Sequence, residues 1–265
     1  MAVDLNLVRA AAIIGAGAGA GFINSIVGSG TLISFPTLVG IGYAERIANI
    51  TNNTGLVPGS FSAVAAQRRE LRGQRARLMR LVPASVLGGL TGALALLVLP
   101  SRYFKRIVPF LILVGVVLVI IGPIVQRRVK ERALARTVAG ADANVHERVS
   151  PWLWIAVALA GVYGGYFGAA QGVILLGLMG TALDDSMARI NATKNVLAGT
   201  VNLIAATVFV IHGGVVWSAA ALLAVGSVIG GVLGSTVGRR IEPNVLRAVI
   251  VLVGLTAAGK LLLAG

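Results

Sequence analysis

Polar side chains recur at one spacing in two parts of this hydrophobic chain. The sequence Asn49-Ile50-Thr51-Asn52-Asn53 returns 142 residues later as Asn191-Ala192-Thr193-Lys194-Asn195. Residues four apart share one face of a helix, so the outer asparagines of each copy are co-facial. Carboxamides both donate and accept hydrogen bonds, and a helix start adds free N–H groups and a dipole that favours an anion. The motif therefore predicts two matched parts of a binding site for an anion.

A structural interpretation of the same motif stays open. Asparagine and threonine cap helices, and within a membrane they join helices by hydrogen bonds worth roughly 0.6–2 kcal/mol each. Capping alone would not require three matched positions in each copy. The duplicated spacing therefore favours ligand binding.

Lys194 lies inside the second copy, where the first copy has Asn52. An ammonium group within a membrane span costs about 3 kcal/mol or more, so such a lysine usually lines a cavity or marks a functional site. We expect Lys194 to attract or neutralise an anionic substrate. The alternative is a lysine at the membrane edge whose side chain extends to anionic headgroups.

Glycine-rich breaks interrupt each half of the chain once. Gly28-Ser29-Gly30 joins the apolar segments 8–27 and 30–42, and Gly168-Ala169-Ala170-Gln171-Gly172 does the same before segment 171–183. The second segment of each pair is too short to cross a membrane as a helix. Glycine disfavours helix and permits other backbone conformations, which predicts broken or re-entrant helices. Ser29, Thr31, Gln171 and Gly172 would then contact a ligand or satisfy the backbone opened by the breaks.

The remaining reactive residue types do not form a catalytic or metal-binding pattern. The chain has no cysteine, and its two histidines, His146 and His212, are far apart. Adjacent Asp184 and Asp185 lie near Arg189, and we expect a solvated cap cluster, with proton coupling as the alternative role. A P-loop-like run ends in Lys260 but continues with Leu261 instead of serine or threonine. We therefore expect no enzymatic activity, no metal and no cofactor.

Composition places these motifs in a membrane protein. Of the 265 residues 57% are hydrophobic and 12% charged, against about 25% charged in soluble domains. Runs such as 107–125, 215–237 and 245–264 reach the roughly 20 residues that cross a hydrocarbon core as a helix. A membrane β-barrel would instead show alternating ten-residue segments. The predicted fold class is all-α and polytopic.

The apolar segments predict two repeats of about five helices each, 8–10 segments in total. The first repeat, residues 1–125, contains segments 8–27, 30–42, 46–67, 81–99 and 104–125. The second repeat, residues 151–265, contains segments 152–169, 171–183, 190–212, 215–238 and 244–264. A basic cytoplasmic linker, 126–150, joins them. Gly88-Gly89-x-x-Gly92 and Gly230-Gly231-x-x-Gly234 are expected to pack helices closely.

Positive charge predicts the orientation. The net charge is +14, and arginines gather in loop 68–80 and in the linker, where the positive-inside rule places cytoplasmic charge. The equivalent of the first loop, 211–215, has no lysine or arginine and is expected outside, which predicts inverted repeats with both termini outside. One group opposes this assignment: Arg102, Lys105 and Arg106 would be external. Anionic lipid headgroups are the expected partners of the arginines, and nucleic acid is not expected.

The motifs, in this order, resemble the TauE/SafE family of sulfite and organosulfonate exporters. The resemblance rests on Gly21 to Leu32, Pro36, Ala48 to Asn52 and the second-half stretches 161–172 and 191–195. It covers nearly the whole chain outside the linker. The positions that match the family's motifs are Gly28, Gly30, Asn49, Thr51, Asn191 and Thr193. Ala170, opposite Gly28 in the second half, departs from the pattern.

The resemblance implies secondary transport of a small sulfur-containing or carboxylate anion across the bacterial cytoplasmic (inner) membrane. We expect the anion near the midplane, between the two breaks and the two asparagine motifs, with access alternating between the repeats. Coupling to protons is a further hypothesis, and the sequence offers no buried carboxylate for it. The alternatives are an anion channel and a membrane assembly subunit without transport of its own.

Overall fold

The computed structural model describes residues 5–138, 149–183, 185–238 and 243–263, and in these ranges every regular element is a helix. The order is α1 (Leu7–Ile26), α2 (Thr31–Ile41), α3 (Glu45–Ala66), α4 (Arg75–Val98), α5 (Ser101–Val138), α6 (Pro151–Tyr166), α7 (Gln171–Ala182), α8 (Met187–His212), α9 (Trp217–Thr236) and α10 (Pro243–Leu263). The prediction of an all-α polytopic membrane protein is confirmed. Asp184, the charged pair Arg239 and Arg240, and His146 lie outside the described residues.

Among the residues with a described placement, six helices are long and apolar enough to cross a membrane: α1, α4, α8, α9, Ser101–Ile124 of α5 and Val245–Leu263 of α10. Helix α3 has 22 residues, but the asparagine motif lowers its hydropathy. Helix α6 has only 16 residues, and α2 and α7 have 11 and 12. The short helices belong to two hairpins, because four residues join α1 to α2 and four join α6 to α7.

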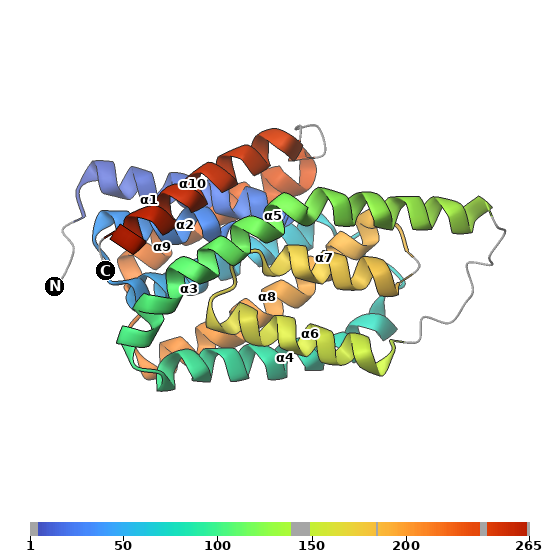
Figure 1. Ribbon diagram of the computed structural model, residues 1–265, viewed down its shortest axis with the longest axis horizontal. Helices are drawn as coiled ribbons and strands as arrows, with labels where there is room; N and C mark the ends of the chain where they lie inside the picture. The colour runs from blue at the N-terminus through green and yellow to red at the C-terminus, as the bar shows by residue number, and fades with distance from the viewer. Residues whose placement is uncertain (1–4, 139–148, 184, 239–242, 264–265) are drawn as a thin grey trace.

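The two hairpins enter the bundle from opposite ends. In Figure 1, α1 begins on the left and α6 begins on the right, while α5 and α10, the last helices of the two halves, also run in opposite directions. Each half therefore contributes one re-entrant hairpin followed by three crossing helices. An odd number of crossings reverses the second half relative to the first, as inverted repeats require.

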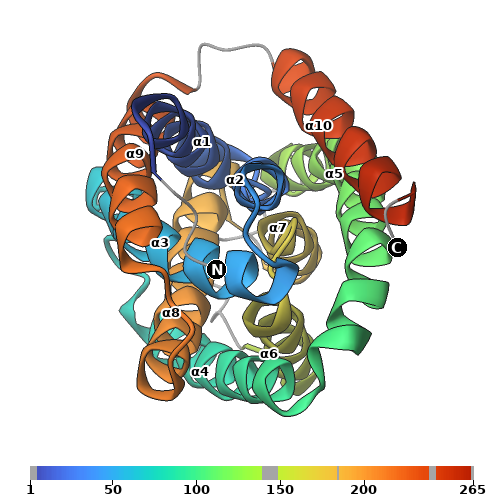
Figure 2. The same cartoon turned by 90° about the vertical axis from the view of Figure 1, so that its left-hand side faces the viewer.

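The halves interlock instead of folding side by side. Helix α9 packs against α1 and α3, and the equivalent α4 packs against α6 and α8. Helix α3 packs against its equivalent α8, and α5 packs against its equivalent α10 (Figure 2). The division of the chain into domains at 1–125, 126–150 and 151–265 stays a prediction.

The predicted glycine faces form the closest helix contacts. A Cβ atom on Gly88 of α4 would overlap the carbonyl oxygen of Ala158 in α6, and one on Gly230 of α9 would overlap that of Ala18 in α1. The backbones therefore touch, and only glycine permits this approach. The packing interpretation of both glycine motifs is confirmed.

The same contacts correct the register between the halves. Gly88 and Gly230 differ by 142, but their partners Ala158 and Ala18 differ by 140. The breaks show the same shift, since Gly28 and Gly168 both have positive φ, 85° and 77°. A single offset of 142 is therefore wrong for the hairpins. Two extra residues, in α7 and in the connection after it, restore 142 before the asparagine motif.

Predicted boundaries agree with the helices to within a few residues, with two exceptions. Helix α4 begins at Arg75, six residues before the predicted segment, and α5 continues to Val138, well into the predicted linker. The arginines and lysines in those stretches lower the local hydropathy, so the predicted segments were shorter than the helices. The arginine-rich loop before α4 lies at the same end of the bundle as the far end of α5, opposite both termini (Figure 1).

Candidate functional site

The two helix breaks touch each other in the middle of the bundle. The N–H of Gly172 donates to the carbonyl oxygen of Gly28 at 3.0 Å. A Cβ on either glycine would overlap the Cα atom of the other. Because Gly28 also has a positive φ, this position excludes any side chain for two independent reasons. The hairpin tips, far apart in sequence, are thus in direct contact.

A polar cavity, called here the central cavity, lies beside this contact. Its volume is about 30 Å³, which is room for one or two water molecules. Residues from both breaks, both hairpins and the two long polar helices line it: Asn24, Ser25, Gly28, Thr31, Gly59, Ser60, Ala63, Gly168, Gln171, Gly172, Lys194, Asn195, Ala198 and Asn202. Six of these were predicted as site residues, namely Gly28, Thr31, Gln171, Gly172, Lys194 and Asn195.

Lys194 is fully buried at the edge of the central cavity. Its Nζ donates to the carbonyl oxygen of Asn24 at 2.8 Å. Within the described ranges no carboxylate forms an ion pair with it. The interpretation of Lys194 as a lysine at the membrane edge is wrong, because the side chain lies inside the bundle.

The asparagines of the second copy cover the end of α1. Nδ2 of Asn191 and Nδ2 of Asn195 donate to the carbonyl oxygen of Ser25, at 2.9 Å and 3.2 Å. Together with Lys194 they satisfy two carbonyl groups that the end of a helix leaves open. Because helix C-termini have negative partial charge, these donors also offset the negative end of α1 at the cavity.

The first copy of the motif binds the end of α6 in the other hairpin in the same way. Nδ2 of Asn49 donates to the carbonyl oxygen of Tyr166, the last residue of α6, at 3.0 Å. The Thr51 hydroxyl accepts from the N–H of Val216 just before α9, and the Thr193 hydroxyl donates to Gln74 just before α4. Each motif therefore joins its own helix to the opposite repeat. Asn49, Thr51, Asn53 and Thr193 are buried but do not line the central cavity.

The breaks present the beginnings of two helices to the same place. Helix α2 starts at Thr31 and α7 at Gln171, and both residues line the central cavity. The Gly30 N–H is already used, since it donates to Oδ1 of Asn24 at 2.7 Å. Ser29 Oγ and Gln171 Nε2 are buried, and the described part of the chain offers them no hydrogen-bond partner. Two positive helix ends and an unpaired amide donor thus converge, an arrangement that suits a negative ligand.

Sequence reasoning missed several polar residues of the cavity. Asn24 binds both Lys194 and the start of α2, and Ser60 lies 3.4 Å from Asn202. Ser60 and Asn202 are themselves related by the 142-residue offset. Polar residues at equivalent positions of both halves were therefore a signal that could have found this pair.

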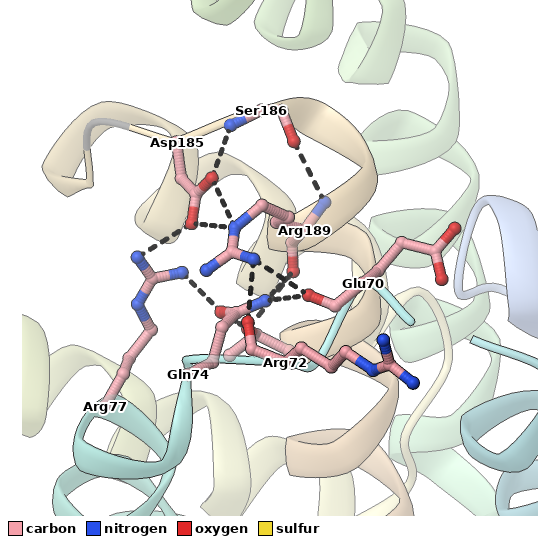
Figure 3. Close-up of polar contacts among 8 residues, drawn as sticks. Glu70, Arg72, Gln74, Arg77, Asp185, Ser186 and Arg189 are labelled. Carbon is pink, nitrogen blue, oxygen red and sulfur yellow. Dashed lines mark hydrogen bonds and ion pairs between the residues drawn. The ribbon is translucent and has the colours of Figure 1, made fainter. Parts of the chain in front are cut away.

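A second polar cluster lies at the arginine-rich end of the bundle (Figure 3). The carboxylate of Asp185 forms ion pairs with Arg77 at 2.9 Å and with Arg189 at 2.8 Å. The side chain of Arg77 is fully buried and that of Asp185 is 10% exposed. The prediction of a solvated cap cluster is wrong for the side chain of Asp185, because it is mostly buried against Arg77 of α4 and Arg189 of α8.

Gln74 connects this cluster to the asparagine motif. Its Oε1 accepts from Arg77 and from the Thr193 hydroxyl, and its Nε2 donates to the carbonyl oxygens of Glu70 and Arg189. Loop 67–74 is thereby fixed to the start of α8. No group of three metal-binding side chains occurs among residues with a described placement.

Comparison with known proteins agrees with this architecture. The sequence pattern of the family described as sulfite exporter TauE/SafE matches residues 13–261. The chain is 27% identical to the probable membrane transporter protein YfcA of Escherichia coli K12, over 92% of this chain and 86% of that protein. It is 27% identical to the probable membrane transporter protein ORF9 of Sinorhizobium sp, over 92% and 88%, and 25% identical to one from Haemophilus influenzae, over 91% and 90%. No solved structure matches the chain significantly.

The family match extends from the middle of α1 almost to the end of α10 and so includes both hairpins, both asparagine motifs and the central cavity. With six candidate spans and this match, the chain is a multi-pass membrane protein of the sulfite exporter TauE/SafE family.

Proposed function

We propose that this protein is a secondary transporter that exports a small anion, such as sulfite, an organosulfonate or a related carboxylate, across the bacterial cytoplasmic membrane. The observation on which the proposal rests is Lys194, a fully buried amine at the central cavity with no carboxylate partner in the described structure. A buried charge without a counter-charge is costly. An anion in the cavity would provide that counter-charge.

The surroundings of Lys194 suit an oxyanion. The amide of Gln171 is an unpaired donor, and α2 and α7 begin at the cavity. The negative end of α1 is already satisfied by Asn191, Asn195 and Lys194. An unpaired donor, Nε2 of Gln171, thus belongs to a residue that lines the cavity, and the acceptors at the end of α1 are already used.

The size of the cavity supports a transport cycle with closed states. Room for one or two water molecules is less than a three-oxygen anion with its contacts requires. Binding must therefore widen the cavity, and the two hairpins, whose tips meet at Gly28 and Gly172, offer the moving parts. Interlocked inverted repeats support alternating access between the two ends of the bundle. Coupling to protons stays a hypothesis, and a flux independent of the pH gradient would contradict it.

Ligand binding to purified protein tests the proposal. Sulfite, sulfoacetate, taurine, sulfate and simple carboxylates are added, and thermal unfolding is followed, because a ligand of the folded state raises its stability by mass action. We expect one anion class to stabilise the protein. We expect Lys194→Met to weaken that affinity by about 30-fold or more, as removal of a buried charged partner does.

Lys260→Met is the matched control, because Lys260 is an exposed lysine of α10 and its replacement should leave the affinity unchanged. Equal loss in both variants, or no stabilisation by any anion with intact protein, would contradict the proposal. Counter-transport of labelled substrate in proteoliposomes separates a transporter from a channel, which would not show it. An assembly subunit would neither bind nor transport the anion.

A further inference from the structure

We propose that a second cavity is the passage between the arginine-rich end of the bundle and the central cavity, and that Gln67 controls it; this rests on the proposed function. The second cavity, called here the vestibule, has a volume of about 80 Å³. It is lined by Ser25, Ile26, Gln67, Ala188, Asn191, Gly234 and Ser235.

The vestibule has an exposed lining residue on one side and shares a lining residue with the central cavity on the other. Ala188, in the first turn of α8, is exposed, and the residues around it belong to the ends of α1, α3 and α9 on the arginine-rich side. At its inner side the vestibule shares Ser25 with the central cavity. The two cavities are thus neighbours on either side of Ser25.

Gln67 lies between the two cavities and is hydrogen-bonded to a residue of each. Its Oε1 accepts from Nδ2 of Asn195, a central-cavity residue, at 3.0 Å. Its Nε2 donates to Oγ of Ser235, a vestibule residue, at 3.4 Å. Gln67 is 6% exposed and its backbone ends α3, so its side chain can turn away while the backbone of α3 stays in place. A neutral amide at this position offers an anion a donor, where a carboxylate would repel it.

The equivalent place in the other half is filled. The residues that correspond to Gln67 and Ser235 are Phe209 and Ala93, and both are fully buried. They belong to one apolar cluster with Phe104, whose ring stacks edge-on against Tyr166 with centroids 5.7 Å apart. Inverted repeats would allow two symmetric passages. In this structure polar residues line the passage at the arginine-rich end, whereas buried apolar and aromatic side chains fill the equivalent place at the other end. The vestibule is therefore the open side, and the site in it would take the same small oxyanion on its way to Lys194.

Cysteine labelling tests the passage, because the chain has no cysteine of its own. The probe is methanethiosulfonate ethylsulfonate, a membrane-impermeant reagent that itself bears a sulfonate. Single cysteines are placed in the vestibule (Ser235→Cys), in the central cavity (Ala198→Cys) and at the plugged equivalent (Ala93→Cys). Exposed Ala76→Cys and Ser101→Cys mark the arginine-rich end and the opposite end in sided vesicles.

We expect Ser235→Cys and Ala198→Cys to react when the reagent is added on the side of Ala76. Ala93→Cys should react more than about tenfold more slowly than either of them, from whichever side the reagent is added. Adding Gln67→Phe, which places the residue of the plugged side into the passage, should slow labelling of Ala198→Cys at least about tenfold and leave Ser235→Cys unchanged. Gln67→Ala, which removes the side chain without filling the space, should speed labelling of Ala198→Cys.

Labelling of Ala198→Cys from the Ser101 side, or a rate unaffected by Gln67→Phe, would overturn the passage. Gln67→Ala is the control for misfolding. A folding defect caused by loss of the Gln67 side chain would not speed labelling of Ala198→Cys while leaving that of Ser235→Cys unchanged. The failure of the passage is distinguishable from that of the proposed function. If Lys194→Met abolishes anion binding while Ser235→Cys stays unreactive, only the passage is wrong. If Ser235→Cys and Ala198→Cys react as expected but Lys194→Met leaves anion binding unchanged, the passage exists and the proposed anion site is wrong.

Discussion

The two halves of the chain share their architectural contacts and differ in their charges. Asn49 and Asn191 each donate to the last carbonyl groups of the opposite half's broken helix, at 3.0 Å and 2.9 Å. Beside Asn191 the second half has Lys194 and the central cavity, where the first half has buried Asn52. The shared residues hold the duplicated backbone together, so the asymmetric residues are where the function should be sought.

The two ends of the bundle also share their backbone arrangement and differ in their charged residues. At the arginine-rich end, Asp185 joins Arg77 and Arg189 under loop 67–74 (Figure 3). The equivalent residues at the other end are Tyr43, Ala219 and Ile47. Loop and helix are thus joined by ion pairs at one end, whereas apolar and small residues occupy the equivalent positions at the other, although the backbone plan is the same.

The largest expected effect comes from breaking the ionic end. Asp185→Ala leaves the buried guanidinium of Arg77 without its carboxylate, and loss of one partner of a buried pair costs about 3–5 kcal/mol of unfolding free energy. Thermal and denaturant unfolding of the purified protein measure the loss.

Glu131→Ala is the control for this variant, because Glu131 pairs with Arg127 on the exposed part of α5 and should contribute less than about 1 kcal/mol. The double variant Arg77→Ala with Asp185→Tyr copies the apolar end, and it should be more stable than Asp185→Ala. Equal stability of Asp185→Ala and Glu131→Ala would show that the two ends do not differ as described.

The next effect tests a contact that the halves share. Gly88→Ala and Gly230→Ala each place a methyl group against a backbone carbonyl of the facing helix, and overpacking of this kind costs about 1–3 kcal/mol. Because the two contacts are equivalent, the two losses in melting temperature should agree closely.

Gly15→Ala is the matched control in α1, where an added Cβ would meet no atom within 4 Å. It should raise the stability by about 0.5–1 kcal/mol, since alanine favours a helix interior over glycine. A loss confined to one of the two packed glycines would mean that the halves do not pack equivalently.

The smallest effect separates architecture from binding. Asn49→Ala removes the donor to the end of α6 and should lower the unfolding free energy by about 1 kcal/mol, as the loss of one hydrogen bond does. Asn195→Ala should cost a similar amount and also weaken anion binding, because Asn195 lines the central cavity. Thermal unfolding with and without the anion measures both quantities, and equal weakening of affinity by the two variants would contradict the asymmetry.

Much of this architecture could be read from local sequence. Apolar runs predicted the membrane helices, because a segment in lipid must bury its backbone in its own hydrogen bonds. The glycine breaks at Gly28 and Gly168 and the short segments after them predicted the re-entrant hairpins. The two glycine motifs predicted closely packed helices, and the duplicated asparagine motif predicted two matched parts of one site, which stays a prediction.

Other features depended on contacts between distant parts of the chain. Asp185 looked solvated because its sequence neighbours are a loop, but its side chain pairs with buried Arg77, more than 100 positions away in the sequence. The same holds for Gln67, which acquires its place only when α8 and α9 pack around the end of α3.

By itself, the sequence determined which segments enter the membrane, that they form two related halves, and which polar residues are duplicated, because these depend on local hydropathy and spacing. Only the tertiary structure decided that the breaks meet at Gly28 and Gly172, and that the hairpin register differs by two residues. It also decided that buried Lys194 lines the central cavity, whereas Asn52, its equivalent in the first half, does not. The physical reason is that burial and hydrogen-bond pairing are set by the interlocking of the halves, and the distance between residues in sequence does not reveal it.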